Sequence, residues 1–322
     1  MDISQLTQYL IIGLADGALI ALIALGYTLV YGVVELINFA HGEIFMMGAF
    51  FATTLITWIG VTRDSSAPAI LVTALLGLVG AMAFSAILNF SIDRVAYRRL
   101  RNAPRLAPLI AAIGFSFILQ NIGIYWHGSN AFSPPSIIPT KYVRYNILVE
   151  WFGLDTKIRV RPLDIAVLAV TIPLLIGLSW FVYRTRTGKA MRATAQDREA
   201  AALMGIDINR AIGVAFILGG SLAGAAGMVA LYYNNSARFQ MGFRYGLFAF
   251  TAAVLGGIGN LNGAVLGGFI IGIIWSLSDG YMKTFVSGWG AQWTPSVIFG
   301  VLVIMMIFKP TGLLGEHTSD KV

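Results

Sequence analysis

Apolar segments of about 20 residues, the length at which a helix crosses a bilayer, follow one another along almost the whole chain. Inside a bilayer no water is available to the backbone, so such segments must form helices that satisfy their own N–H and C=O groups. Charged residues make up only 11% of the sequence, whereas a soluble domain carries roughly 25%. The sequence therefore predicts an all-α, polytopic membrane protein with a single transmembrane domain over residues 1–322.

The hydrophobic pattern indicates about nine transmembrane helices, within a range of about eight to ten. The seventh of them is short and rich in glycine, which favours a helix that does not cross the bilayer completely. The expected ranges are 8–31, 36–60, 68–92, 106–127, 163–183, 210–232, 245–259, 262–281 and 294–309.

Basic residues define the expected orientation of these helices. Short loops rich in lysine and arginine stay in the cytoplasm, and more than half of the 22 basic residues fall on one side of the predicted arrangement. That side is predicted to be cytoplasmic, so an odd number of spans places the N-terminus outside and the C-terminus inside. The basic residues on this side are Arg94, Arg98, Arg99, Arg101, Arg105, Arg184, Arg186, Lys189, Arg192, Arg198, Arg210, Lys309 and Lys321.

The segment 128–162 is the only long connection predicted on the opposite side. Its first part contains Pro134, Pro135 and Pro139, and because proline fixes φ and cannot donate a hydrogen bond, this part is predicted to be irregular. The segment either docks an external partner or lies on the membrane surface. Aromatic residues in this segment and just before it are placed as interface anchors would be: Trp126, Tyr142, Tyr145 and Trp151.

Residues 183–210 form the longest run with steady charge and no apolar block. The alanine-rich part, 188–204, predicts one short helix that ends at Gly205. Such a helix either docks in the groove of a partner or belongs to an ordinary solvated loop. Its expected polar strip is Lys189, Arg192, Gln196 and Glu199, and its expected small face is Ala190, Ala193, Ala200, Ala201 and Met204.

Polar residues interrupt the beginning of the second predicted span. Ionisable groups at membrane depth cost about 2.5–3.5 kcal/mol on insertion scales, so they normally face a cavity, a partner group or the surface. The interruption is either a broken helix that lines a binding site or a short cytoplasmic turn, and the absence of flanking basic residues favours the broken helix. The residues concerned are Glu35, Asn38, His41, Gly42 and Glu43.

A second broken or re-entrant helix is predicted near residues 256–263, where Asn260 and Asn262 form a polar turn. An interrupted apolar segment in each half is typical of internally repeated transporters. Asp16 and Asp279 are further charges within predicted spans, and Asp279 is expected in the headgroup zone. Glycines at every fourth position predict close helix packing: Gly259, Gly263 and Gly267, and also Gly268 and Gly272.

Several classes of function find no support in the sequence. There is no cysteine for a disulfide or a thiolate metal site, and no His/Glu spacing typical of a metal centre. Gly188 and Lys189 are followed by alanine, so they do not form a Walker phosphate loop. The net charge of +7 fits contact with anionic lipid and shows no nucleic-acid footprint.

Three runs of the sequence resemble the LivH-type permeases, the membrane subunits of bacterial branched-chain amino acid ABC transporters. They are GYTLVYGVVELINFAHGEIFMMGAF, TGKAMRATAQDREAAALMGIDINR and AFTAAVLGGIGNLNGAVLGG, which lie in the family's order and span most of the chain. The resemblance implies a permease of the bacterial inner membrane that imports branched-chain amino acids, with a periplasmic N-terminus and a cytoplasmic C-terminus. Segment 128–162 would then be periplasmic.

The resemblance also implies partners. A second, LivM-like permease would complete the pathway, a periplasmic binding protein would deliver the substrate, and two ABC ATPase subunits would bind ATP and Mg in the cytoplasm. This chain itself would be no enzyme and would bind no cofactor. Segment 184–209 would couple it to the ATPases, although the I-x-L-P ending of other ABC permeases is absent. The implied coupling residues are Arg192, Asp197, Glu199, Ala200, Ala201 and Gly205; the predicted pathway residues are Glu35, Asn38, His41, Gly42, Glu43, Asn260 and Asn262.

Two alternatives remain open from the sequence. Relatives of the same family that move urea or short amides share much of these runs. A stand-alone secondary transporter would need intramembrane charges for ion coupling, for which Asp16, Glu35 and Glu43 are the candidates, and would not need a docking helix.

Overall fold

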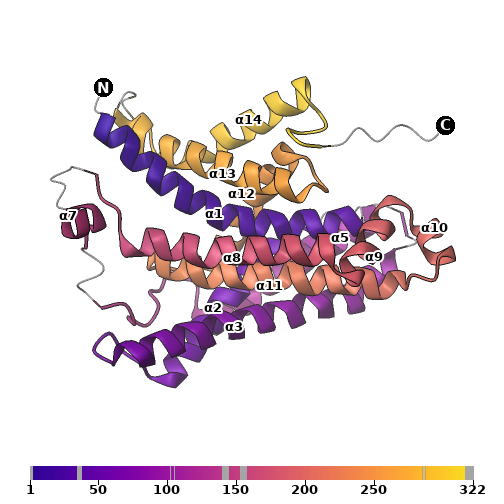
Figure 1. Ribbon diagram of the computed structural model, residues 1–322, viewed down its shortest axis with the longest axis horizontal. Coiled ribbons are helices and arrows are strands. Elements are labelled where there is room, and N and C mark those ends of the chain that lie inside the picture. The colour runs from indigo at the N-terminus through magenta and orange to yellow at the C-terminus, as the bar shows by residue number, and fades with distance from the viewer. Residues whose placement is uncertain are drawn as a thin grey trace.

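The computed structural model describes residues 3–34, 38–101, 103–104, 106–139, 145–152, 158–284, 286 and 288–315. In these residues the chain forms helices and no named strand; Phe132 and Ala237 form an isolated β-bridge. The predicted all-α class is confirmed. Figure 1 shows the long helices running roughly side by side along the longest axis of the molecule.

The helices follow the apolar segments of the sequence. The long ones are α1 (Ile3–Val34), α2 (His41–Ile59), α3 (Ala67–Ile92), α5 (Leu106–His127), α8 (Pro162–Arg184), α11 (Ile208–Asn234) and, counted with its extension to Tyr281, α13 (Leu261–Ser276). The shorter ones are α4 (Arg98–Leu100), α7 (Ile147–Phe152), α9 (Arg186–Gln196), α10 (Arg198–Leu203), α12 (Met241–Gly256) and α14 (Thr294–Phe308). Wider π-turns extend α3 over Asp93–Tyr97 and α13 over Leu277–Tyr281, and a 3₁₀ turn follows at Met282–Thr284.

Each of the predicted spans overlaps an apolar helix, but only seven helical stretches in the described residues are long and apolar enough to cross a membrane. The other two, α12 and α14, have 16 and 15 residues. At a rise of 1.5 Å per residue they are about 24 and 23 Å long, shorter than a hydrocarbon core of about 30 Å. The predicted number of about nine crossing helices is therefore not confirmed.

Helix α13 lies between α1 and α12 and uses a different row of glycines against each. A Cβ added to Gly268 would lie 2.6 Å from the Cα of Ala21 in α1, and Gly272 is equally tight against Gly17. The opposite row, Gly263 and Gly267, meets the backbone of Gly256 and Ala252 in α12. The predicted role in close helix packing is confirmed for Gly263, Gly267, Gly268 and Gly272. It is wrong for Gly259, which lies in the turn before α13 at φ 94° with open space at the position of a Cβ.

Hydrogen bonds identify what lies at each end of the long helix α1. Near its start, the Gln8 amide donates to the carbonyl of Arg159 at 3.0 Å and accepts from the Arg159 N–H at 2.6 Å. At its other end, the Arg198 guanidinium donates to the carbonyl of Val33 at 3.1 Å. The bundle thus has α7 and its flanking segments at one end and α9 and α10 at the other (Figure 1).

The prediction of one continuous helix over 188–204 is wrong, because the chain breaks at Asp197 into α9 and α10. Asp197 has an extended backbone, with φ −158° and ψ 112°, and its carboxylate accepts from the N–H of Ala200 at 3.0 Å. Aspartate is a preferred helix N-cap, so it begins a second helix where the alanine content suggested continuation. The break also divides the expected small face, since Ala201 is buried whereas Ala200 and Met204 are exposed.

Residues 128–139 form an irregular loop, as the prolines predicted. Backbone bonds between Phe132 and Ala237, at 3.0 and 2.8 Å, attach the loop to the turn after α11. Further along, the Asn146 amide donates to the carbonyl of Ile158 at 2.9 Å and accepts from the N–H of Val160 at 3.1 Å. The predicted interface residue Tyr142 lies outside the described residues.

Candidate functional site: a cavity where two helices begin inside the bundle

Helices α2 and α12 begin within the bundle, and their first turns touch. A Cβ on Gly42 would overlap the carbonyl oxygen of Gly242 and would lie 2.9 Å from the Cα of Gly246. Next to it, the His41 ring lies against Gly26 of α1, which precedes the end of α1 by about 12 Å of helix. Asn38, Ala40 and His41 are buried, so α2 starts among other helices.

Asn38 holds the turn before α2 in place. Its side-chain oxygen accepts from the Tyr97 hydroxyl at 2.8 Å and from the Ala40 N–H at 3.1 Å. Its NH₂ group donates to the Asn89 side-chain oxygen at 3.3 Å, and Asn89 in turn donates to the carbonyl of Phe216 at 2.7 Å. Asn38 is 4% exposed, so this network is buried and joins the turn to the end of α3 and to α11.

Glu43, in the first turn of α2, is completely buried. One carboxylate oxygen accepts from the Ser116 hydroxyl at 3.2 Å and from the Gln120 amide at 2.7 Å, both on α5. The other oxygen lies against Gly242 and has no hydrogen-bond partner in the described part of the chain. A buried carboxylate is stable only when donors compensate its lost hydration, so Ser116 and Gln120 are its supports.

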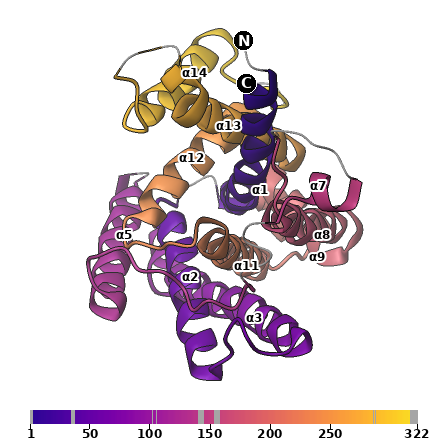
Figure 2. The ribbon, with the colours of Figure 1, turned by 90° about the vertical axis from the view of Figure 1, so that its left-hand side faces the viewer.

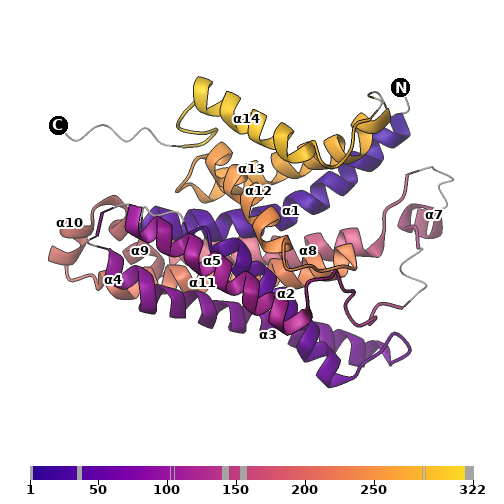
Figure 3. The same ribbon diagram turned by 180° about the vertical axis from the view of Figure 1, so that it is seen from behind.

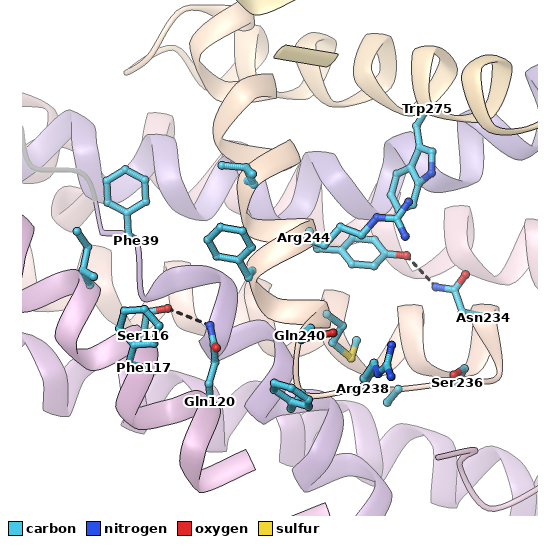
Figure 4. A pocket seen from close by; sticks show the side chains of 17 residues that line it. Phe39, Ser116, Phe117, Gln120, Asn234, Ser236, Arg238, Gln240, Arg244 and Trp275 are labelled. Atoms are coloured by element: carbon cyan, nitrogen blue, oxygen red, sulfur yellow. Dashed lines mark hydrogen bonds between the residues drawn. The ribbon is translucent and has the colours of Figure 1, made fainter. Parts of the chain in front are cut away.

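A cavity of about 960 Å³ lies beside these helix starts. Its size is at the upper end of the range of about 300–1,000 Å³ that is typical of small-molecule sites. Figure 4 shows Ser116 and Gln120 of α5 on one side of it and Arg244 of α12 and Trp275 of α13 on the other. Further lining residues include Phe39, Phe117, Asn234, Arg238, Gln240 and Phe243.

Arg244 provides a positive charge on the wall opposite α5. Its guanidinium carbon lies 5.0 Å from the centre of the Trp275 ring, which is within the distance of a cation–π contact. It also forms an ion pair with Asp279, with 3.8 Å between Nη2 of Arg244 and Oδ2 of Asp279, and its side chain is 44% exposed. Asp279 itself accepts from the Trp275 N–H at 2.8 Å and from the Thr294 hydroxyl. In the described part of the chain, the Arg244 guanidinium is thus held by Trp275 and by its ion pair with Asp279, whose own side chain is 28% exposed.

The cavity opens on one long side of the molecule. Phe117 on α5 and Phe243 on α12 line it and are 60% and 59% exposed. Figures 2 and 3 show α5, α12 and α14 together along this side. The cavity is thus an open groove in this chain, in which apolar and polar side chains, Arg244 among them, are exposed.

The predicted pathway residues divide between this cavity and other places. Glu43 stands directly behind its α5 wall, and Asn38, His41 and Gly42 fix the helix start beside it. Asn260 instead caps α13 and donates to the carbonyl of Leu314 at 2.8 Å. Asn262 lines a separate cavity of about 570 Å³ between α8 and α13. Glu35 lies outside the described residues.

The sequence reasoning missed the residues that line the cavity itself. Ser116 and Gln120 are four residues apart in the predicted span 106–127, and such spacing places both on one helix face. This polar face in an apolar span could have indicated a cavity beside the helix. Arg244 lies just before the predicted span 245–259, where a basic residue looks like an ordinary flank.

The implied coupling residues cluster on α9 and α10. Arg192 stacks over the Tyr183 ring at 5.2 Å, Asp197 caps α10, and Gly205 ends it with φ 82°, as predicted. Glu199 and Ala200 are exposed, whereas Ala201 is buried. At the tip, Leu203 and Met204 are 89% and 82% exposed, so α10 presents an apolar edge at this end of the bundle.

Asp16 of α1 is 9% exposed and lies near Arg161, Asp164 and Asp279. Arg161 and Asp164 form an ion pair at 2.7 Å that also caps the start of α8. Among the described residues, no group of three or more His, Cys, Asp or Glu side chains is arranged to hold a metal ion.

A family model described as "Branched-chain amino acid transport system / permease component" matches residues 9–307. The high-affinity branched-chain amino acid transport system permease protein BraD of Pseudomonas aeruginosa is 36% identical over 100% of this chain and 99% of its own length. The corresponding permease protein LivH of Escherichia coli K12 is 36% identical over 98% of this chain and 97% of its own. A solved structure, "PsaBC from Streptococcus pneumoniae in complex with Fab", is 13% identical and covers 94% of this chain and 92% of its own, with a TM-score of 0.47.

Proposed function

This chain belongs to the family of permease components of branched-chain amino acid transport systems, and from that membership we propose its function. It is the membrane subunit of an ATP-driven importer of branched-chain amino acids, and the cavity beside α2 and α12 is its share of the translocation pathway. The relatives' names support the substrate, and the polar side chains among the mostly apolar lining support the site.

The observation that carries this proposal is the open side of the cavity. A groove that faced lipid would expose Arg244 and Gln120 to hydrocarbon, which is costly for a charged side chain. The exposed apolar rim on α5 and α12 suits contact with another membrane protein. A second, related permease that covers the groove would enclose a pathway between the two chains.

We assign the α10 end of the bundle to the cytoplasm and the α7 end to the periplasm of the bacterial inner membrane. The Arg101 guanidinium donates to the Asn209 side chain at 2.6 Å, so the arginine-rich end of α3 lies at the same end as the start of α11. Loops with dense positive charge remain cytoplasmic. In this orientation α1 begins in the periplasm, the segment 128–162 faces the periplasmic binding protein, and α12 and α14 complete about nine membrane helices as partial crossings.

The exposed edge of α10, at Leu203 and Met204, is proposed as the contact for the ATPase subunits. The hydrogen bond from Arg198 to Val33 connects α10 to the end of α1. A movement of α10 would therefore act on α1, whose Gly26 contacts His41 at the start of α2. ATP and Mg are bound by the partner subunits, and this chain binds no cofactor of its own.

The test is reconstitution in lipid vesicles with a second permease, two ATPase subunits and a binding protein of the same organism. The expected result is uptake of radiolabelled leucine that requires ATP and all subunits. Uptake by this chain alone along an ion gradient would instead support a secondary transporter. Uptake of urea or acetamide in place of leucine would refute the amino-acid assignment and leave the permease assignment standing.

A further inference from the structure

We propose that the groove between α8 and α13 holds one anionic phospholipid, with its phosphate at Arg184 and an acyl chain lying along the groove toward the middle of the membrane. This groove, the cavity of about 570 Å³ that Asn262 lines, is separate from the proposed pathway. The inference goes beyond the proposed function and takes from it only the leaflet: α8 ends on the side assigned to the cytoplasm.

The groove faces the surroundings of the bundle. α8 packs on α1, α9 and α11, and in its most apolar part only 22% of the residues are buried. Two lining residues are buried, Leu25 of α1 and Leu178 of α8, at 2% and 5% exposure. Figure 2 shows α8 on the side of the bundle away from α5, so a second permease on the α5 side leaves this groove to the lipid.

The length of the groove matches one leaflet. Along α8 the lining extends from Leu175 to Arg184, which is about 13 Å of helix, and half of a hydrocarbon core is about 15 Å. Near the Arg184 end, Trp180 and Tyr183 are 62% and 40% exposed, as is typical of aromatic residues at the headgroup level. An acyl chain that starts there reaches the middle of the bilayer beside Leu175 and Val265.

The Arg184 end of the groove is positively charged. Arg192 of α9 stacks over the ring of Tyr183, which lines the groove, and brings a second guanidinium to this end. The segments 175–196 and 257–276 contain no acidic residue, and in the described part of the chain neither arginine forms an ion pair with a carboxylate. A phosphate is therefore the complementary anion, and guanidinium groups bind it by paired N–H donors.

The α13 wall adds uncharged donors. Asn262 lies in the first turn of this helix, is exposed and carries two N–H donors on its side-chain amide. The start of a helix has a partial positive charge, and α13 has no acid in its first turn. Phosphatidylcholine also has a phosphate, but its choline cation cancels the net charge. The groove should therefore prefer an anionic lipid.

The experiment compares two photoreactive lipids, phosphatidylglycerol and phosphatidylcholine, each with a diazirine in the same acyl chain. Each is added in a small amount to phosphatidylcholine nanodiscs that contain the full chain, alone or assembled with its partner subunits, and the crosslinked peptides are identified by mass spectrometry. We expect phosphatidylglycerol to label 175–180 and 261–265 about 5- to 30-fold more strongly, the range that one or two arginines near a lipid surface provide.

Two variants test the two ends of the groove. Arg184→Gln should reduce the preference for phosphatidylglycerol about fivefold, whereas Arg99→Gln, which removes an equally exposed charge at the end of α4, should keep it. Ser179→Phe places a ring in the groove and should reduce labelling by both lipids. Its control is Gly177→Phe, on the same helix at a position with open space outside the groove, which should label like wild type.

Each result supports or overturns the site. Equal labelling by the two lipids, or an unchanged preference in Arg184→Gln, would overturn it. Labelling of the chain alone that disappears in the assembled transporter would show that another subunit covers the groove. Inorganic phosphate that reduces labelling more than chloride of the same ionic strength would show a site for a free anion. Failure of leucine uptake would contradict the proposed function and leave these measurements unchanged.

Discussion

Replacing Asn38 by leucine should destabilise the helix start at α2. Asn38→Leu keeps a similar side-chain volume and removes every polar atom. Three buried groups then lose their partner: the Tyr97 hydroxyl, the Ala40 N–H and the Asn89 side-chain oxygen. Because Tyr97 is 2% exposed and Asn89 is fully buried, water does not replace the lost contacts.

The magnitude follows from these three groups. An unsatisfied buried group costs about 1–3 kcal/mol, whereas hydrogen bonds between membrane helices average about 0.6 and reach about 1.7 kcal/mol in double-mutant cycles. We therefore expect Asn38→Leu to lower the free energy of unfolding by about 2–5 kcal/mol. Tyr97→Phe removes one donor and leaves the Ala40 bond to Asn38 intact, so its expected cost is about 0.6–1.5 kcal/mol.

The assay is unfolding of the purified chain in mixed micelles by increasing SDS, followed by circular dichroism, for both single variants and the double variant. Both single variants lose the hydrogen bond between Tyr97 and Asn38. The sum of their losses in unfolding free energy should therefore exceed the loss in the double variant. Tyr125→Phe, at a tyrosine that is 94% exposed, is the matched control and should unfold like wild type. If Asn38→Leu is as stable as wild type, Asn38 does not stabilise the turn before α2, and only its predicted place in the pathway remains.

Three further predictions follow from the backbone and the proposed orientation. Gly42→Ala should prevent tight packing of α2 on α12 and cost at least about 1–3 kcal/mol, whereas Gly177→Ala, with open space around it, should be neutral or slightly stabilising in the same SDS titration. Gly205→Val places a β-branched residue at φ 82° and should reduce co-purification of the ATPases, while Gly205→Asn should largely retain it. Since the chain has no cysteine, an impermeant thiol reagent applied to intact cells should label Ile3→Cys and not Leu203→Cys; the reverse would invert the orientation.

The positions of the membrane helices were predictable because hydrophobicity is a local property of the sequence. The same holds for Gly205, where a helix needs a residue that tolerates positive φ. Two local signals were misinterpreted or not used: Asp197, whose capping preference competes with the alanine-rich helix, and the polar pair Ser116 and Gln120. An aspartate in an alanine-rich run and two polar residues in an apolar span were both visible in the sequence.

The partners of Glu43 and Arg244 were not predictable, because they come from helices far apart in the chain. Glu43 was identified as out of place in lipid, but nothing nearby in sequence shows that α5 supplies its donors. Likewise, the stacking of Arg244 depends on Trp275, which α13 supplies only because its glycines bring it close to α12. A site built between helices is specified by packing, which hydrophobic patterning does not encode.

The segment that pairs with the start of α2 is not at 256–263, where the sequence suggested a second broken helix. At 256–263 the chain makes a hairpin between antiparallel helices, and Asn260 caps α13 there. The partner of the α2 start is the start of α12, where Gly242 touches Gly42. Each helix start carries a partial positive charge, yet the two differ in their side chains. Glu43 compensates the first turn of α2, whereas α12 has no acid in its first turn and carries Arg244. Two helix starts in contact therefore carry side chains of opposite charge, Glu43 on α2 and Arg244 on α12.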